Sequence, residues 1–252
     1  MISHSNEHNG TSSRWQYARA LRALRRPGVV IFLLTCAVVG IAAKWIVDSK
    51  ESAECHSCQL RLRFIGGYMT VYKERHGALP PAYLVDEDGK PINSWRILVA
   101  SQFWYHFDES GFDLNKPWNG PDNSPFGIDR DPAPDQLRCP AHSGWETALF
   151  TDYVAVVGAN TMWPGSKGAV PALDGSDDEK ILLIEIINSD IPWMEPRDLT
   201  LEQALDAFNP KSGLGIGSTH RCGINYLTVG GEVRTLSRNI SRDSLRKLLV
   251  RD

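Results

Sequence analysis

Residues 28–43 read GVVIFLLTCAVVGIAA, sixteen consecutive positions without a charged side chain, and this stretch decides how the chain is organised. After Lys44 the apolar run resumes with Trp45-Ile46-Val47. An α-helix rises about 1.5 Å per residue, so twenty residues cover roughly the 30 Å hydrocarbon core of a bilayer. A lysine and an indole at the end of the span suit the membrane interface. We therefore predict a transmembrane helix over residues 28–47.

The charges on either side of this span predict its orientation. Residues 1–27 carry five arginines against a single acidic residue, Glu7, whereas residues 48–252 carry an excess of acidic residues. Basic flanks stay in the cytoplasm, so we predict a cytoplasmic, partly disordered tail over residues 1–27. Residues 48–252 are then an extracytoplasmic domain, held by an uncleaved signal anchor in the inner (cytoplasmic) membrane. The alternative is a secretory signal peptide cleaved after Ile41-Ala42-Ala43.

The composition excludes several classes of protein. With 252 residues, 42% hydrophobic and 23% charged, the chain is typical of a folded protein and not of a disordered one. A net charge of −3 with an acidic soluble part argues against nucleic acid as a partner. No G-x-S-x-G, H-E-x-x-H or Walker pattern occurs, so we predict that the protein is not an enzyme. An acid–base pair of His220 with Asp174 or Glu185 would be the enzymatic alternative.

The soluble part predicts a single α+β domain. An apolar face at helical spacing runs through residues 49–76 and continues the membrane helix. Further helices are predicted from Ser94 to Phe107, after a Thr200 capping box, and from Ser241 to Val250. The β-branched and aromatic runs that predict strands come later, at residues 153–157, 181–187, 224–229 and 232–236. Helix first and sheet later is an α+β order, not an alternating βαβ fold.

Seven groups of residues occur in order along residues 50–240, at 58–66 with 76–82, 94–98 with 116–123, 138–140, 153–158, 173–185, 193–199 and 218–236. In this order they resemble the planctomycete-type family called domain of unknown function 1559, also named bacterial solute-binding protein family 10. The family is similar to type IV pilins and pseudopilins. The resemblance implies an N-terminal membrane helix extended into a long helix packed on an antiparallel sheet. It implies no known biochemical activity.

The family signature residues in this chain are His220, Gly230, Gly231, Trp193, Glu195 and Pro196. The C-terminal signature of the family is a histidine, nine residues and then Asp-Gly. Here Gly-Gly follows the histidine at that spacing, so the aspartate is missing. The prepilin signal also departs from the family, because Leu33 lies near the position where its glutamate would fall.

Four cysteines follow the predicted membrane span: Cys55, Cys58, Cys139 and Cys222. Outside the cytoplasm such thiols predict disulfides. Cys58 and Cys139 both fall in blocks of the family resemblance, which makes them the first candidate pair, with Cys55 and Cys222 as the second. Two alternatives stay open. Cys55-His-Ser-Cys58 has the spacing of a redox dithiol, and together with Cys139 and His142 it has zinc-ligand spacing.

Asp174, Asp177, Asp178 and Glu179 form an acidic loop. Carboxylate oxygens suit calcium, but the twelve-residue EF-hand pattern is absent from the sequence. A run of charges is usually a solvated turn, and we predict a turn here. We expect no cofactor, with calcium on this loop and zinc on the cysteines as the alternatives.

The anchor, the ordered blocks and the missing catalytic motifs together predict a non-enzymatic, single-pass membrane protein of pseudopilin-like form. It would have a structural role or be a minor component of a secretion or surface assembly. Its partners would be the membrane and other envelope or pseudopilin-like proteins. The alternative is a membrane-anchored solute- or polysaccharide-binding protein, suggested by the eight tryptophans and by the second family name.

Overall fold

The computed structural model describes residues 27–103, 110–123, 132–142, 148–165 and 177–251. The chain divides into two compact units, Met1–Glu51 and Ser52–Asp252. Apart from Pro27, the predicted basic tail lies outside the described residues. The second unit is an α+β domain, as predicted.

One helix, α2 (Pro27–His76), contains both helices that the sequence predicts over residues 28–47 and 49–76. Its apolar N-terminal part is exposed, and the helix is long and apolar enough to cross a membrane. In the second unit the helix buries one stripe, made of Cys58, Leu62, Ile65 and Met69. This spacing places the four side chains on one helical face, so the stripe can pack in a core.

The main sheet is antiparallel and has the strand order β3-β5-β8-β9, with β7 also paired to β5. Its strands are β3 (Tyr153–Val154), β5 (Ile181–Ile187), β7 (Gly215–Ile216), β8 (Ile224–Thr228) and β9 (Val233–Leu236). As predicted, Gly230-Gly231 joins the last two strands in a hairpin. Gly231 has a φ of 85°, a conformation that glycine adopts without a steric penalty.

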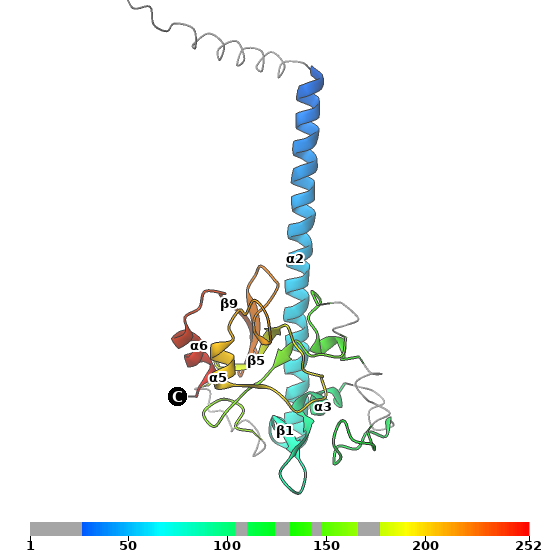
Figure 1. Ribbon diagram of the computed structural model, residues 1–252, viewed down its shortest axis with the longest axis vertical. Helices are drawn as coiled ribbons and strands as arrows, with labels where there is room; N and C mark the ends of the chain where they lie inside the picture. Colours follow the sequence, from blue (N-terminus) through cyan, green and yellow to red (C-terminus); the bar gives the residue numbers. More distant parts are fainter. Residues whose placement is uncertain (1–26, 104–109, 124–131, 143–147, 166–176, 252) are drawn as a thin grey trace, which may run out of the picture. The chain divides into compact units, whose positions relative to one another are not determined.

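Two apolar clusters cover the two faces of this sheet. On one face, the buried stripe of α2 packs with Trp95, Leu183 and Leu227. On the other face, α5 (Leu201–Asp206) and α6 (Arg242–Leu249) contribute Ala204, Leu205, Leu245 and Leu249. Figure 1 shows α5 and α6 on the side of β5 and β9 that faces away from α2. Since both faces are covered, six of the seven residues of β5 are buried.

Smaller elements complete the domain. They are the hairpin of β1 (Tyr83–Val85) and β2 (Pro91–Ser94), the helix α3 (Trp95–Ala100), the turn η2 (Asp135–Leu137), and the parallel pair of β4 (Val156–Val157) and β6 (Leu199–Thr200). The predicted capping box of Thr200 and Gln203 at the start of α5 is confirmed. Ser241 caps α6 through a hydrogen bond from the backbone N–H of Ser244, also as predicted.

Two predicted elements have different bounds in the structure. The predicted strand at residues 153–157 is two short strands, because β3 pairs with β5 while β4 turns to pair with β6. The predicted helix from Ser94 to Phe107 begins as predicted but ends at Ala100, and residues 104–109 lie outside the described part. Strands β6 and β7 have two residues each, too few to leave a periodic signal in the sequence.

Candidate functional site: a buried cluster of cysteine, glutamate and histidine

Four buried side chains with metal-binding and acid–base chemistry meet where α2 faces the sheet. They are Cys58 from α2, Cys139 from the segment after η2, Glu185 from β5, and His220 from the loop between β7 and β8. One sulfur, nitrogen or oxygen atom from each residue lies within 4.8 Å of those of the other three. We call this group the Cys–Glu–His cluster.

A polar row across three strands forms the floor of the cluster. Tyr153 of β3 pairs in register with Glu185 of β5. The backbone N–H of Asn225 in β8 donates to Glu185 Oε2 over 3.1 Å. Alternate strand residues face the same side of a sheet, so Glu185 shares the α2 side with Leu183 of the core. This alternation explains how a carboxylate in an apolar strand comes to face Cys58.

The two loop residues of the cluster are held by their backbones. The N–H of Cys139 donates to Asp152 Oδ2 over 2.5 Å. The N–H of His220 donates to Ser218 Oγ over 3.1 Å, and its carbonyl oxygen accepts a hydrogen bond from Arg238 Nη2. Both loops are therefore fixed by contacts outside the cluster.

A disulfide ties the histidine loop to the long helix. Cys55 and Cys222 are bonded, with their Cα atoms 6.6 Å apart. This is the second of the two predicted pairs. The first, Cys58 with Cys139, is wrong for this structure, where both residues are thiols. Cys55 lies three residues before Cys58 and Cys222 two residues after His220, so the disulfide holds two elements of the cluster together.

His220 lies at the centre of the cluster. Its Nε2 is 3.1 Å from the sulfur of Cys139 and 3.4 Å from Oε1 of Glu185. Its Nδ1 is buried and has no hydrogen-bond partner among the described residues. The glutamate is held in turn by Ser218, whose Oγ donates to Oε1 over 3.0 Å.

Hydrogen bonds also converge on the sulfur of Cys58. It accepts from the hydroxyl of Tyr153 over 3.0 Å and from Nδ2 of Asn225 over 3.4 Å. Donors aimed at a sulfur atom stabilise the thiolate over the thiol. The same Nδ2 also donates to Glu185 Oε2 over 3.3 Å, so one amide orients two members of the cluster.

The proximity of these groups shifts their pKa values. A hydrogen bond from Cys139 is the largest cause that lowers the pKa of Cys58 to about 7, against the effect of burial. The same hydrogen bond, together with burial, raises the pKa of Cys139. Burial acts to lower the pKa of His220, but hydrogen bonds to Cys58 and Glu185 outweigh it and raise the pKa to about 10. The cluster therefore favours an anionic sulfur and a cationic imidazole.

Of the four residues that sequence spacing groups as zinc ligands, the structure brings two together in the cluster. Cys58 and Cys139 do meet, but Cys55 is in the disulfide. His142 is not in the cluster, since its Nδ1 contacts Asp152 Oδ1 over 2.8 Å. The hydrogen bond to this carboxylate is the largest cause that raises the pKa of His142. Glu185 and His220, which take the two remaining places, lie in sequence blocks with no metal-ligand spacing, so the sequence could not group them.

The enzymatic alternative named His220 with Asp174 or Glu185. The structure places the histidine against Glu185, whereas Asp174 lies outside the described residues. All four members of the cluster are buried, so a substrate in solution has no direct access to them.

One of the other signature residues, Glu195, contacts a second buried group. The carbonyl oxygen of Glu195 accepts from Nη1 of Arg96 over 3.3 Å, and Arg96 forms an ion pair with Asp198. Trp193 is buried in the α2-side core, and Pro196 lies between the two acidic residues in the sequence. Glu195 thus contacts the buried ion pair, and none of these three signature residues belongs to the Cys–Glu–His cluster.

The acidic loop gives its carboxylates separate partners in the described residues. Asp177 Oδ2 is 3.4 Å from Nε of Arg251, and Glu179 Oε1 is 3.0 Å from Nη1 of Arg234. Asp174, the remaining aspartate of the loop besides Asp178, lies outside the described residues. The predicted turn is confirmed at residues 177–179, but Asp177 and Glu179 contact arginines there, whereas the sequence predicts a solvated turn.

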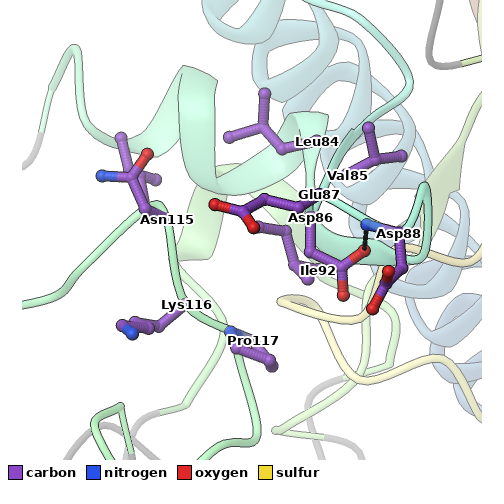
Figure 2. A pocket seen from close by; sticks show the side chains of 10 residues that line it. Leu84, Val85, Asp86, Glu87, Asp88, Ile92, Asn115, Lys116 and Pro117 are labelled. Carbon is purple, nitrogen blue, oxygen red and sulfur yellow. Dashed lines mark hydrogen bonds between the residues drawn. The ribbon is translucent and has the colours of Figure 1, made fainter.

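A cavity of about 600 Å³ lies beside the β1–β2 turn (Figure 2). Its lining includes the acidic side chains Asp86, Glu87 and Asp88 on one side and Lys116 on another. None of its lining residues is aromatic. Of the five tryptophans in the described residues, four are buried, namely Trp95, Trp118, Trp163 and Trp193. In the described part of the chain, no aromatic platform for a sugar ring lines this cavity.

Comparison with known proteins adds no relative. No family model, no curated protein and no solved structure matches the chain. The pseudopilin-like resemblance accordingly stays a prediction.

Proposed function

We propose that this protein is a non-enzymatic, single-pass membrane protein of pseudopilin-like form, with residues 48–252 outside the cytoplasm. Its role is structural, or that of a minor component in a secretion or surface assembly. One observation carries the proposal: α2 is exposed and apolar at its start and then buries a single stripe in an α+β core. An anchor continuous with a core helix is the architecture that the family resemblance implies.

The exposure pattern at the start of α2 supports a lipid environment. Exposed apolar side chains there include Ile31, Phe32, Leu33, Val39, Ile41 and Val47. They lie on every side of the helix, which distinguishes the segment from the one-sided stripe of a core helix. In water such a surface would be costly, whereas lipid tails cover it without a partner protein.

The disulfide supports the proposed side of the membrane. Cys55 and Cys222 both belong to the unit that follows the apolar segment. Disulfides persist outside the cytoplasm and are rare inside it. The arginines before the span favour the same orientation, with the N-terminus in the cytoplasm.

The burial of the Cys–Glu–His cluster supports a non-enzymatic role. Catalysis requires a reacting group that touches its substrate, and no member of the cluster is more than 2% exposed. In this proposal the cluster stabilises the domain, and the partners are the membrane and other envelope or pseudopilin-like proteins.

Reporter fusions test the topology directly. A reporter enzyme that is active only outside the cytoplasm, fused after Asp252, should be active, and a reporter that is active only inside should be silent. Deletion of residues 28–47 is the control and should exchange the two results. An uncleaved anchor predicts that the wild-type fusion stays in the membrane fraction after an alkaline wash. A stable fusion that is active only inside the cytoplasm would refute the proposal, and a fully soluble extracytoplasmic product would show a cleaved signal peptide instead.

A further inference from the structure

We propose that Cys58, Cys139, Glu185 and His220 together bind one zinc ion. The site does not depend on the membrane topology proposed above, because it rests on the contacts of these four side chains alone. It also differs from the zinc set that sequence spacing suggests, since two of the four ligands are new.

The distances fit a single ion. Zinc bonds of about 2.3 Å to sulfur and about 2.0 Å to nitrogen or oxygen give tetrahedral edges of about 3.5 Å between sulfur and nitrogen, and about 3.3 Å between nitrogen and oxygen. The corresponding distances are 3.1 Å from Cys139 Sγ to His220 Nε2 and 3.4 Å from this nitrogen to Glu185 Oε1. With all four donor atoms within 4.8 Å of one another, one ion can reach each of them.

The donor set selects the metal. Two cysteine sulfurs, one imidazole nitrogen and one carboxylate oxygen are ligands that zinc accepts, whereas calcium and magnesium require oxygen alone. Thiolates exclude these hard cations and favour borderline or soft ions. Because all four positions come from the protein and are buried, the site has the closed form of structural zinc and not the open form of a catalytic centre.

A cation would also resolve the electrostatics of Glu185. Among the described residues, this buried carboxylate has an ion-pair contact with His220 and none with a lysine or an arginine. An isolated buried carboxylate is costly unless it is paired or coordinates a metal. Zinc supplies the charge, and it lets the histidine bind as a neutral imidazole through Nε2.

The surrounding hydrogen bonds are those of an outer coordination shell. The hydroxyl of Tyr153 and the amide of Asn225 donate to the sulfur of Cys58, and Ser218 donates to Glu185. Such contacts orient ligands and tune their basicity, and their loss typically weakens metal binding about 10- to 100-fold.

The ion would join four distant parts of the chain. The ligands lie on α2, on the segment after η2, on β5 and on the loop before β8. The Cys55–Cys222 disulfide already holds α2 to that loop, so half of the site is brought together before the metal binds. Cys58 and Cys139 are outside any disulfide, so both sulfur atoms are free to lose a proton and bind the metal as thiolates.

Metal content is the first test. The full chain, purified in detergent without chelator, should contain one zinc ion per molecule. After removal of the zinc, cobalt(II) should bind with the visible absorption of a tetrahedral cobalt–thiolate site. Cys58→Ser should abolish that absorption, while Cys36→Ser, the same change in the predicted membrane span, should leave it intact. Wild-type protein that holds no zinc and binds neither zinc nor cobalt would overturn the proposal.

Two conservative substitutions test the site with little risk of misfolding. Tyr153→Phe keeps the buried ring and removes only the hydroxyl that donates to Cys58, so zinc affinity should fall at least about tenfold. Tyr226→Phe makes the same change on the far face of the sheet and should leave the affinity unchanged. Equal affinities in both variants and the wild type would contradict the outer-shell assignment and with it the site.

Mass spectrometry separates zinc from a second disulfide. In zinc-loaded native protein, Cys58 and Cys139 should resist alkylation, and both should react as thiols once the protein is denatured with a chelator. Cys55 and Cys222 should stay linked in the same sample. A Cys58–Cys139 disulfide as the main species would replace the metal site with the pairing that the sequence places first.

Discussion

The buried ion pair of Arg96 and Asp198 makes a sharp prediction about stability. The two side chains are 0% and 2% exposed, and Nη2 of the arginine lies 2.5 Å from Oδ1 of the aspartate. Burial lowers the pKa of Arg96 and raises that of Asp198, while the opposite charge of each partner counteracts the shift. Each partner therefore helps to keep the other charged, together with the hydrogen bonds that Asp198 accepts from Ala155 and Trp95.

Asp198→Asn removes the charge at nearly constant shape and replaces the buried, unpartnered Oδ2 with an amide NH2 group. In the wild type, Oδ1 of Asp198 accepts hydrogen bonds from the N–H of Ala155 over 2.8 Å and from Nε1 of Trp95 over 3.2 Å. The asparagine retains this oxygen and can still accept both hydrogen bonds. The arginine is left buried without the carboxylate that it contacts, and breaking a buried ion pair typically costs about 3–5 kcal/mol of unfolding free energy. For a domain of this size each kcal/mol lowers the Tm by about 2–4 °C, so the expected decrease is about 6–20 °C.

Thermal unfolding of the full chain in detergent, followed by tryptophan fluorescence, measures this shift. Asp206→Asn is the matched control, because Asp206 pairs with Arg242 where both side chains are more than half exposed. Such surface pairs contribute at most about 1 kcal/mol, so the control Tm should fall by less than about 4 °C. Equal shifts in the two variants would refute the reasoning that burial makes the first pair critical.

Two further predictions compare matched substitutions by chemical denaturation. Leu62→Ala should lower the free energy of unfolding by about 2–5 kcal/mol, because this side chain is 0% exposed in the core. Leu60, on the same helix, is 39% exposed, so Leu60→Ala should lower it by less than about 1 kcal/mol. Similar losses in the two variants would contradict the assigned buried face of α2. Gly223→Ala should destabilise more than Gly231→Ala, although both glycines have positive φ, because only at Gly223 would the new Cβ lie 2.3 Å from the carbonyl oxygen of Leu236. The cost at the open Gly231 should be about 1–2 kcal/mol, and an equal cost at both sites would argue against this close approach.

Local sequence determined several features of the protein correctly. The apolar run before Lys44 and the spacing of the buried stripe predict α2, because helical periodicity is a property of neighbouring residues. The sequence also predicts the capping box at Thr200 and the hairpin turn at Gly230-Gly231 correctly, since each depends on residues a few positions apart. Local sequence does not predict the two-residue strands or the division between β3 and β4 after Val154, because the strands that pair with them are distant in the chain.

The buried cluster belongs to the tertiary structure. The sequence identifies four cysteines and one signature histidine, but it carries no signal that Glu185, in an apolar strand, faces the same point as His220. Disulfide pairing is open in the same way, since Cys55 and Cys58 lie on one helical face and only the fold shows which of them meets Cys222. Periodicity records which way a side chain points within its own element, whereas contacts between residues 58, 139, 185 and 220 depend on how α2, β5 and two loops pack together.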